Sequence, residues 1–579
     1  MRVKIERLNS LSKVAHRVDE ADSWIPRLVG LAALLLVAAP LITVTVAAFR
    51  PGMTLPFQAG EWTVRNFIEA FGDPFVYRLL LNTFLYTFAS LAISLPMALG
   101  FAWLVERTDL PYRNSIYTLL LIPLAVPSLL KALGWVMLLG PRQGVINLLL
   151  RDALGLQGAE GPLNIYSFAG MVFLTVLSVM PSMFLLLGPL LRTMNPLFEE
   201  ASESAGATMF DTLRKIILPL ISPGVLAVIL YYIIVMIEYF EIPLAIGLNA
   251  RFPVLSLQIY ALTRSEQLPQ YGLASTYSFL GLGLGCCLLY QYRRLTAGSQ
   301  KYEVITGKGY TQRKVKLGWT RYLALAFIGL YLLLAVILPM IILLWASLLD
   351  FYVTPAWDAL SRASFKNYFA VFRNPRILTA ANNTLILFLT VATFTTLLAL
   401  LISWVIHRFR PPFGWLLDAI VFLPLAVPSI VIALGVLLFY IRTPLWGTIW
   451  VIALGHQIRF LPFTVRSLSA AILQIHQELE EASWVSGASR LATLRTVTFP
   501  LLLPALGNSW LWVAVHSMRD FSFPLMLVSY QNIVITSLLW SLWEEANLTG
   551  LSALAILLIL ASIVFTVASR RIASQGAHY

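Results

Sequence analysis

Six charged side chains lie inside long apolar runs of the chain, where ionised groups are rare and usually functional. They are Lys131, Glu238, Glu241, Arg459, Arg519 and Asp520. Each would cost ~2.5–3.5 kcal/mol near the middle of a bilayer if it faced lipid. We therefore expect these side chains to face the interior of a helix bundle and to pair, Glu238 or Glu241 with Arg519 or Lys131.

Two chemical interpretations of these charges stay open. They form either a structural network of ion pairs, or a gate or lining of a pathway for a charged substrate. The pathway candidates are Lys131, Glu238, Tyr239, Glu241, Arg519 and Asp520. The phenol oxygen of Tyr239 suits a hard cation, although tyrosines in apolar runs also serve packing or interfacial anchoring.

The remaining polar residues do not predict an enzyme. The fragment Thr306-Gly307-Lys308-Gly309 lacks the upstream glycine and the hydroxyl of a phosphate-binding loop. His456 and His516 stand alone in apolar runs, where we expect satisfied interior histidines. Cys286 and Cys287 are adjacent and offer neither a disulfide framework nor metal-ligand spacing. No catalytic residue and no metal site is assigned.

Two polar segments share one internal order. The first has Glu200-Ala201-Ser202, Gly206 and Leu218-Pro219, and the second has Glu481-Ala482-Ser483, Gly487 and Phe499-Pro500. In both, six residues separate Glu from Gly and thirteen separate Gly from Pro. The pattern predicts a short helix with small residues on one side, a glycine that lets the chain bend, and a proline that marks re-entry into the membrane.

These segments resemble the EAA loops in the permease subunits of type I bacterial ATP-binding-cassette importers. Ser202 and Ser483 replace the third Ala of the family pattern, and Val497 and Phe499 replace Ile and Leu in the second copy. The resemblance implies two coupling helices, each docking on one copy of a separate ATPase subunit that carries ATP and Mg. The coupling residues it implies are Glu200, Ala201, Gly206, Leu218, Pro219, Glu481, Ala482, Gly487, Phe499 and Pro500.

Composition and run length predict an all-α integral membrane protein. The 579 residues are 59% hydrophobic and 12% charged, which excludes an ordinary water-soluble chain. Apolar runs long enough to cross a bilayer of ~30 Å number about twelve. The fifth run of each half is expected near residues 223 to 246 and 504 to 528. The net charge of +13 is spread too thinly to form a nucleic-acid surface.

The chain contains an internal repeat. The segment TVRNFIEAFGDP from Thr63 recurs 301 residues later as SFKNYFAVFRNP from Ser364, and IPLAVPS from Ile122 recurs as LPLAVPS from Leu423. Later landmarks recur at an offset of 281, as Pro181 does with Pro462. An even number of spans per repeat predicts two parallel six-span halves.

This repeat sets the expected domain boundaries. They are a cytoplasmic N-terminal segment at 1–27, a first permease half at 28–292 with its EAA loop at about 192–222, a cytoplasmic linker at 293–319, a second half at 320–569 with its loop at about 471–503, and a cytoplasmic tail at 570–579.

Most Lys and Arg residues lie on one side of the predicted spans. This bias places both termini in the cytoplasm, and the chain in the bacterial inner membrane as a multi-pass protein. The first half has about 20 additional residues on the opposite side. There, 142–164 predicts a short surface helix, either a resting place for a periplasmic binding protein or a simple shield.

The fused two-half arrangement is most similar to the ferric-iron permeases of this importer superfamily. FEIPLAIG from Phe240 and YGLAS from Tyr271 add to that resemblance. It implies a binding-protein-dependent importer that moves substrate by alternating access, with a periplasmic substrate-binding protein, two ATPase copies and membrane lipid as partners. Phosphonate, thiamine and polyamine permeases, an ion-coupled secondary transporter and a membrane receptor or scaffold stay open as alternatives.

Overall fold

The computed structural model describes residues 24–52, 54–192, 201–202, 204–264, 268–296 and 314–576. Within these ranges the chain forms helices, and the one β-type pairing is an isolated parallel bridge between Thr108 and Val315. Nine helices are long and apolar enough to cross a membrane, and the number rises to 12 if each of three bent helix pairs is one span. The predicted all-α membrane fold is confirmed.

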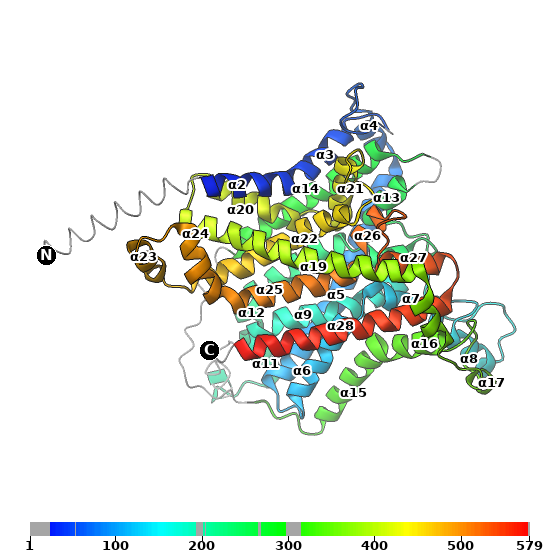
Figure 1. The fold of residues 1–579 in the computed structure, drawn as a ribbon. Helices are drawn as coiled ribbons and strands as arrows, with labels where there is room; N and C mark the ends of the chain where they lie inside the picture. The colour runs from blue at the N-terminus through cyan, green and yellow to red at the C-terminus, as the bar shows by residue number, and fades with distance from the viewer. Residues whose placement is uncertain are drawn as a thin grey trace. The chain divides into compact units, whose positions relative to one another are not determined.

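The helices group into two compact units. Unit 1 comprises Met1–Thr63, Pro375–Leu538 and Ala561–Tyr579, and unit 2 comprises Val64–Asn374 and Leu539–Leu560. Unit 1 therefore contains the first span of the first sequence half, and unit 2 contains the first span of the second half. We call these two spans the exchanged first spans. The helices are shown in chain order in Figure 1.

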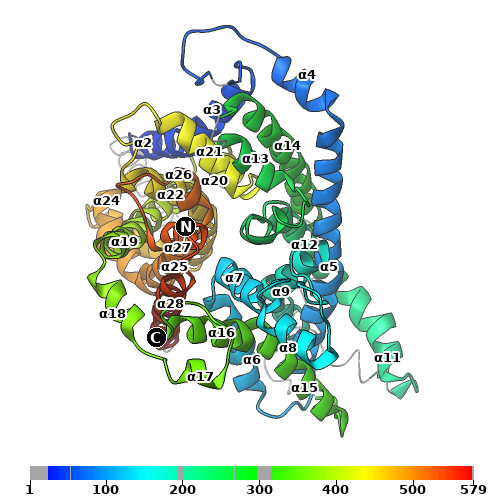
Figure 2. The ribbon, with the colours of Figure 1, turned by 90° about the vertical axis from the view of Figure 1, so that its right-hand side faces the viewer.

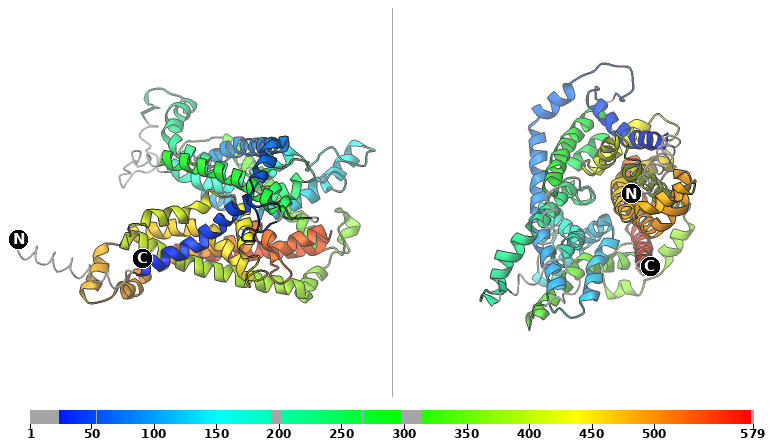
Figure 3. Two further views of the ribbon diagram at one scale, coloured as in Figure 1. Left: turned by 90° about the horizontal axis from the view of Figure 1, so that it is seen from above. Right: turned by 90° about the vertical axis from the view of Figure 1, so that its left-hand side faces the viewer.

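The helices of unit 1 fall in three stretches. They are α2 (Trp24–Ala33), η1 (Leu34–Ala38), α3 (Ala39–Ala48), α19 (Pro375–Trp404), η7 (Val405–Phe409), α20 (Gly414–Phe422), η8 (Leu423–Leu425), α21 (Ser429–Tyr440), α22 (Ile449–Leu473), α23 (Gln477–Val485), α24 (Arg490–Thr493), η9 (Leu494–Thr498), α25 (Phe499–Arg519) and α26 (Ser522–Leu527). The long helix α19 packs against α22 and α25, and the three run side by side in Figures 1 and 3.

The helices of unit 2 begin with the first copy of the repeat. They are α4 (Arg65–Gly72), α5 (Pro74–Arg107), α6 (Arg113–Leu121), η2 (Ile122–Ala125), α7 (Ser128–Leu139), α8 (Val145–Leu154), α9 (Phe168–Arg192), α11 (Met209–Thr212), η3 (Leu213–Ile217), α12 (Leu218–Ile237), η4 (Pro243–Gly247), α13 (Leu255–Thr263), α14 (Tyr271–Thr296), α15 (Thr320–Leu332), η6 (Leu333–Ile337), α16 (Leu338–Ser347), α17 (Trp357–Leu360) and α18 (Lys366–Arg373). Here α5 packs on α9 and α12, as the end-on view of Figure 2 shows. Two further helices, α27 (Ile535–Glu544) and α28 (Leu548–Gly576), are divided between the units.

Each exchanged first span packs closely on a glycine of its unit. In unit 1, α3 lies against α21, and a Cβ on Gly435 would come within 2.6 Å of the Pro40 carbonyl oxygen. In unit 2, α16 lies against α7, and a Cβ on Gly134 would come within 3.0 Å of the Pro339 Cβ. The two glycines are equivalent at the 301 offset. A hydrogen in place of a side chain therefore permits both contacts.

A π-helical turn precedes four of the prolines that lie near helix starts. The turns η1, η3, η6 and η9 each end two residues before Pro40, Pro219, Pro339 and Pro500, respectively. Proline lacks an N–H and clashes with the carbonyl four residues earlier, so the helix widens by one residue instead of ending. Pro219 and Pro500 therefore lie within continuous helices, near the start of each fifth span.

The third span of each half is broken at the repeated PLAVPS motif. The helix axes before and after it differ by 86° in the first copy and 109° in the second. Two prolines remove backbone donors and disfavour the helical conformation of the residues before them. The motif therefore bends the span at the same point in both halves.

The fifth spans end earlier than the sequence predicts. Helix α12 ends at Ile237 and α25 at Arg519, where apolar runs continue to about residue 246 and 528. The apolar runs continue through the short helices η4 and α26, and average hydropathy does not register the backbone breaks between them. Glu238 and Asp520 thus lie at these breaks rather than within a helix.

We expect Gly435→Ala to lower the stability of the protein by ~1–3 kcal/mol, because the added methyl group forces the exchanged span away from α21. Apparent unfolding temperatures of the purified protein in detergent, followed by tryptophan fluorescence, measure the effect. Gly100→Ala is the matched control, since it lies in helix α5 and has no atom within 4 Å of the new Cβ. Equal unfolding temperatures for the two variants would contradict the close-contact role.

Candidate functional site

The second polar segment forms a short helix that turns away from the spans of unit 1. Helix α23 follows α22 at an angle of 73° and ends at Ser486. The amide of Ala488 donates to the carbonyl of Ser483 at 3.1 Å, and Gly487 has a φ of +88°. This is a Schellman C-cap, in which a residue with positive φ lets the last amides reach back to the helix. The glycine is thus required by the backbone conformation.

The first polar segment repeats this geometry in unit 2. The amide of Ala207 donates to the carbonyl of Ser202 at 3.1 Å, and Gly206 has a φ of +81°. No atom lies within 4 Å of a Cβ built on either glycine, so space does not dictate glycine there. The chain therefore bends at both glycines, as the sequence predicts.

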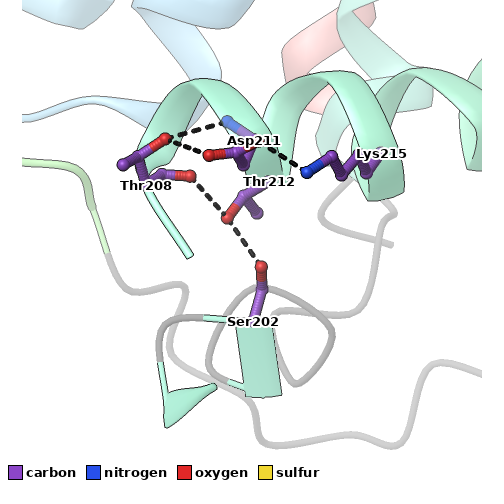
Figure 4. A network of polar contacts seen from close by, with 5 residues as sticks. All are labelled: Ser202, Thr208, Asp211, Thr212 and Lys215. Atoms are coloured by element: carbon purple, nitrogen blue, oxygen red, sulfur yellow. Dashed lines mark hydrogen bonds and ion pairs between the residues drawn. The ribbon is translucent and has the colours of Figure 1, made fainter. Parts of the chain in front are cut away.

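A hydroxyl bridge joins each capped helix to the helix that follows. Ser202 Oγ lies 2.8 Å from Thr212 Oγ1, as Figure 4 shows, and Ser483 Oγ lies 2.9 Å from Thr493 Oγ1. These serines are the residues that depart from the Ala of the family pattern. A threonine follows ten residues after each serine, and this repeated spacing is the signal in the sequence from which the bridge could have been predicted.

The helices after the glycines also start alike. Thr208 Oγ1 accepts from the amide of Asp211 at 3.2 Å, and Ser489 Oγ accepts from that of Ala492 at the same distance. Both hydroxyls therefore serve as N-caps. Asp211 additionally lies 2.8 Å from Lys215 Nζ, and hydrogen bonds from Lys215 and Thr208 lower the pKa of its exposed carboxyl group (Figure 4). The capping geometry recurs, whereas this charge pair belongs to the first copy.

A buried ion pair anchors the second copy to its spans. Arg408 Nε lies 2.8 Å from Glu480 Oε2, and the two side chains are only 6% and 1% exposed. Thr498 Oγ1 donates to Glu480 Oε1 at 2.7 Å, and Arg408 Nη2 donates to the carbonyl of Ile475 at 3.0 Å. The cluster ties η7, α23 and η9 together. Sequence analysis missed it, because Arg408 and Glu480 are far apart in the chain.

Part of each predicted coupling set is open to solvent. Ala201, Ala482, Pro219 and Pro500 are exposed, whereas Glu481, Leu218 and Phe499 are half-buried. Glu200 lies outside the described residues. Helix α23 also exposes the large apolar side chains of Leu479 and Val485. The second segment therefore exposes small and apolar side chains on a helix whose opposite side is bound by the Arg408–Glu480 pair.

The pathway candidates lie on or next to helix ends. Lys131 and Glu238 are buried in the protein, as expected for charges that avoid lipid, and Glu241, Arg519 and Asp520 are half-buried. Tyr239 donates its hydroxyl hydrogen to Ser128 Oγ at 2.8 Å, which joins the end of the fifth span to the start of α7.

His456 is the satisfied interior histidine that the sequence predicts. Its Nδ1 lies 2.8 Å from Ser517 Oγ and its Nε2 lies 3.2 Å from Asp520 Oδ2. Asp520 Oδ2 also accepts from the amide of Phe523 at 3.1 Å. This chain of bonds fixes the break between α25 and α26 against α22. Among the described residues, no three His, Cys, Asp or Glu side chains gather as a metal site.

A family model described as "Binding-protein-dependent transport system inner membrane component" matches residues 93–296 and 399–575. The chain belongs to this family. Each matched stretch contains one capped segment and leaves the exchanged first span outside it. The protein is thus a multi-pass permease component of a transport system.

Two ferric-transport relatives of this permease match most of its length, and a sulfate-transport relative matches about a third of it. The ferric transport system permease protein FbpB of Actinobacillus pleuropneumoniae is 25% identical over 88% of this chain and 72% of its own length. The putative FbpB 1 of Haemophilus influenzae is 25% identical over 90% of this chain and 81% of its own. The sulfate transport system permease protein CysT of Salmonella typhimurium is 27% identical, over 35% of this chain and 79% of its own.

We expect Arg408→Met to destabilise the permease by ~3–5 kcal/mol, because it leaves the Glu480 carboxylate buried without its cation. Arg408→Met with Glu480→Leu should recover much of this loss, since both charges then leave the interior. Heating series of the detergent-purified variants, scored by the fraction that remains monodisperse, measure the difference. Arg142→Met is the control, because the Arg142–Glu160 pair is exposed and should contribute at most ~1 kcal/mol. A double variant no more stable than the single one would contradict the pairing.

Proposed function

We propose that this permease is the membrane subunit of an ATP-driven importer for ferric iron, which works with a periplasmic substrate-binding protein. The observation that carries the importer assignment is the duplicated capped helix, one in each unit, with the same glycine, hydroxyl bridge and N-cap. Ferric iron is favoured because the relatives named for it match about nine tenths of the chain, whereas the sulfate permease matches about a third.

In this proposal, Glu200 to Gly206 and Glu481 to Gly487 are coupling segments that dock on two copies of a separate ATPase subunit. Glu481 and Ala482 face the docking surface, and ATP and Mg bind to the partner. The exposed side chains of Leu479 and Val485 supply apolar contact area in the second copy. Both termini and the linker lie in the cytoplasm, on the side of the coupling segments.

Movement of the ATPases passes to the spans through the contacts behind the coupling segments. In unit 1 the buried Arg408–Glu480 pair and Thr498 connect α23 to the ends of two long helices. In unit 2 the Ser202–Thr212 bridge connects the first segment to the helix that enters α12. Closure of the ATPase dimer thereby changes access to the pathway, provided that loaded binding protein favours the same state.

Ions cross the membrane by way of the candidates at the helix breaks. Lys131, Glu238, Tyr239, Glu241, Arg519 and Asp520 supply the polar groups, and iron is the cargo rather than a resident cofactor. The reaction on this chain is therefore a passage, without a covalent step. The breaks after α12 and α25 place these groups where short helices, rather than full spans, meet the membrane interior.

The substrate assignment is tested in proteoliposomes that contain the permease, its ATPase and its binding protein. We expect ATP-dependent accumulation of radiolabelled ferric citrate, with none when the ATPase is omitted. Accumulation of sulfate, thiamine or a phosphonate in place of iron would overturn the substrate while keeping the importer. Uptake driven by a proton or sodium gradient without ATPase would overturn the importer itself.

We expect Gly206→Val with Gly487→Val to keep ATP hydrolysis in the assembled complex and to abolish most iron uptake. A β-branched residue at positive φ costs at least ~1–2 kcal/mol, so the capped helices lose their geometry. The ratio of ATP hydrolysed to iron accumulated measures the uncoupling. Gly507→Val is the control, because this glycine has no atom within 4 Å of a Cβ and no positive φ. Normal uptake by the double variant would count against docking through these segments.

A further inference from the structure

The repeated segments before the long spans fold as two short helices. Both have an exposed apolar stripe, an opposite side bound to the protein, and charged side chains beside the stripe. One stripe consists of Val64, directly before α4, with Ile68 and Phe71 of that helix. Its equivalent consists of Phe365, directly before α18, with Phe369 and Phe372. All six are large apolar side chains between 47% and 67% exposed. Helical spacing places each set within one narrow stripe. Both helices belong to unit 2.

The opposite side of each helix is fixed to the protein. In α18, Asn367 Nδ2 donates to the carbonyls of Ser347 and Leu349 at 2.9 and 2.6 Å, and Tyr368 Oη lies 2.8 Å from Ser347 Oγ. In α4, Asn66 is buried and Phe67 packs edge-on against Phe279 at 6.1 Å. The apolar stripes therefore cannot turn inward without the loss of these contacts.

Each stripe comes directly before a membrane span that itself exposes apolar side chains. One residue separates α4 from α5 and α18 from α19. Exposed apolar side chains on the spans begin at Tyr77 and Leu378, six positions after Phe71 and Phe372, and Leu81, Leu85 and Phe88 continue the first row. The stripes thus precede, along the chain, the exposed apolar rows of the two spans.

Charged side chains flank both stripes at equivalent positions. Arg65 lies 2.6 Å from Glu69, and Lys366, the equivalent of Arg65, lies 3.0 Å from Asp350. All four of these side chains are largely exposed. An apolar stripe with aromatic residues and a charged edge is the pattern of a helix that lies in the plane of a membrane surface.

We propose that α4 and α18 are interfacial anchors, whose stripes sink into the boundary between lipid headgroups and acyl chains. Their occupant is the bilayer, and they lie at the ends of the spans away from the coupling segments. The Glu106–Arg192 pair supports this placement, because it joins the far end of α5 to the end of α9 that leads into the first coupling segment. The two anchors hold unit 2 at one depth.

Spin labels on single cysteines test the proposal. Cys286 and Cys287 are both exposed and are first replaced by Ala. Labels at Ile68→Cys and Phe369→Cys are compared with labels at their neighbours, Glu69→Cys and Ala370→Cys, in vesicles of phosphatidylethanolamine and phosphatidylglycerol. We expect the stripe labels to show higher collision rates with oxygen and lower rates with a water-soluble nickel chelate than their neighbours.

Any of three results would overturn the proposal. The first is equal access of the nickel chelate to the stripe labels and to their neighbours. The second is protection of the stripe labels only after the binding protein is added, and the third is spin–spin broadening that grows with protein density because a second copy covers them. Phe372→Cys repeats the measurement if Phe369→Cys does not fold. Retained ferric uptake by the labelled variants shows that the vesicles contain the native state.

Discussion

A buried carboxylate holds helix α23 to the spans of unit 1, and the proposed transport cycle depends on that attachment. A carboxylate inside a protein is tolerated only when a cation and hydrogen bonds compensate its lost hydration. Glu480 has both, from Arg408 and Thr498, which stand on two different helical segments. Displacing α23 alone would therefore separate a buried ion pair, so a force applied to this helix moves the spans with it.

The described parts of the two copies share their backbone bonds and differ in one exposed charge pair. Both have the positive-φ glycine, the hydroxyl bridge and the N-cap, at positions related by the same offset. The first copy adds an exposed pair between Asp211 and Lys215, which contributes little to stability in water. The helix shape is thus what the repeat preserves in the described residues, whereas the exposed Asp211–Lys215 pair is particular to the first copy.

Features that depend on residues close together in the chain could be predicted from the sequence. Spans follow from apolar run length, and the bends at Gly206 and Gly487 follow from the need for positive φ. The contact between Arg408 and Glu480 was not predictable, because one sequence does not show which distant residues meet. The ends of α12 and α25 were misplaced because proline-bounded short helices continue the apolar run. The neighbours of each first span were equally hidden, since hydropathy locates a span without locating its partners.

The exchange of first spans gives the linker a structural task. Span α15 belongs to unit 2, although the sequence places it at the start of the second half. Immediately before it, Val315 exchanges backbone hydrogen bonds with Arg107 and Asp109 at 2.9 and 3.0 Å, and Asp109 Oδ1 accepts from the amide of Leu317 at 2.8 Å. These bonds join the end of the linker to the end of α5. The chain is thereby fixed to unit 2 directly before α15, and the following helix α16 brings Pro339 against Gly134.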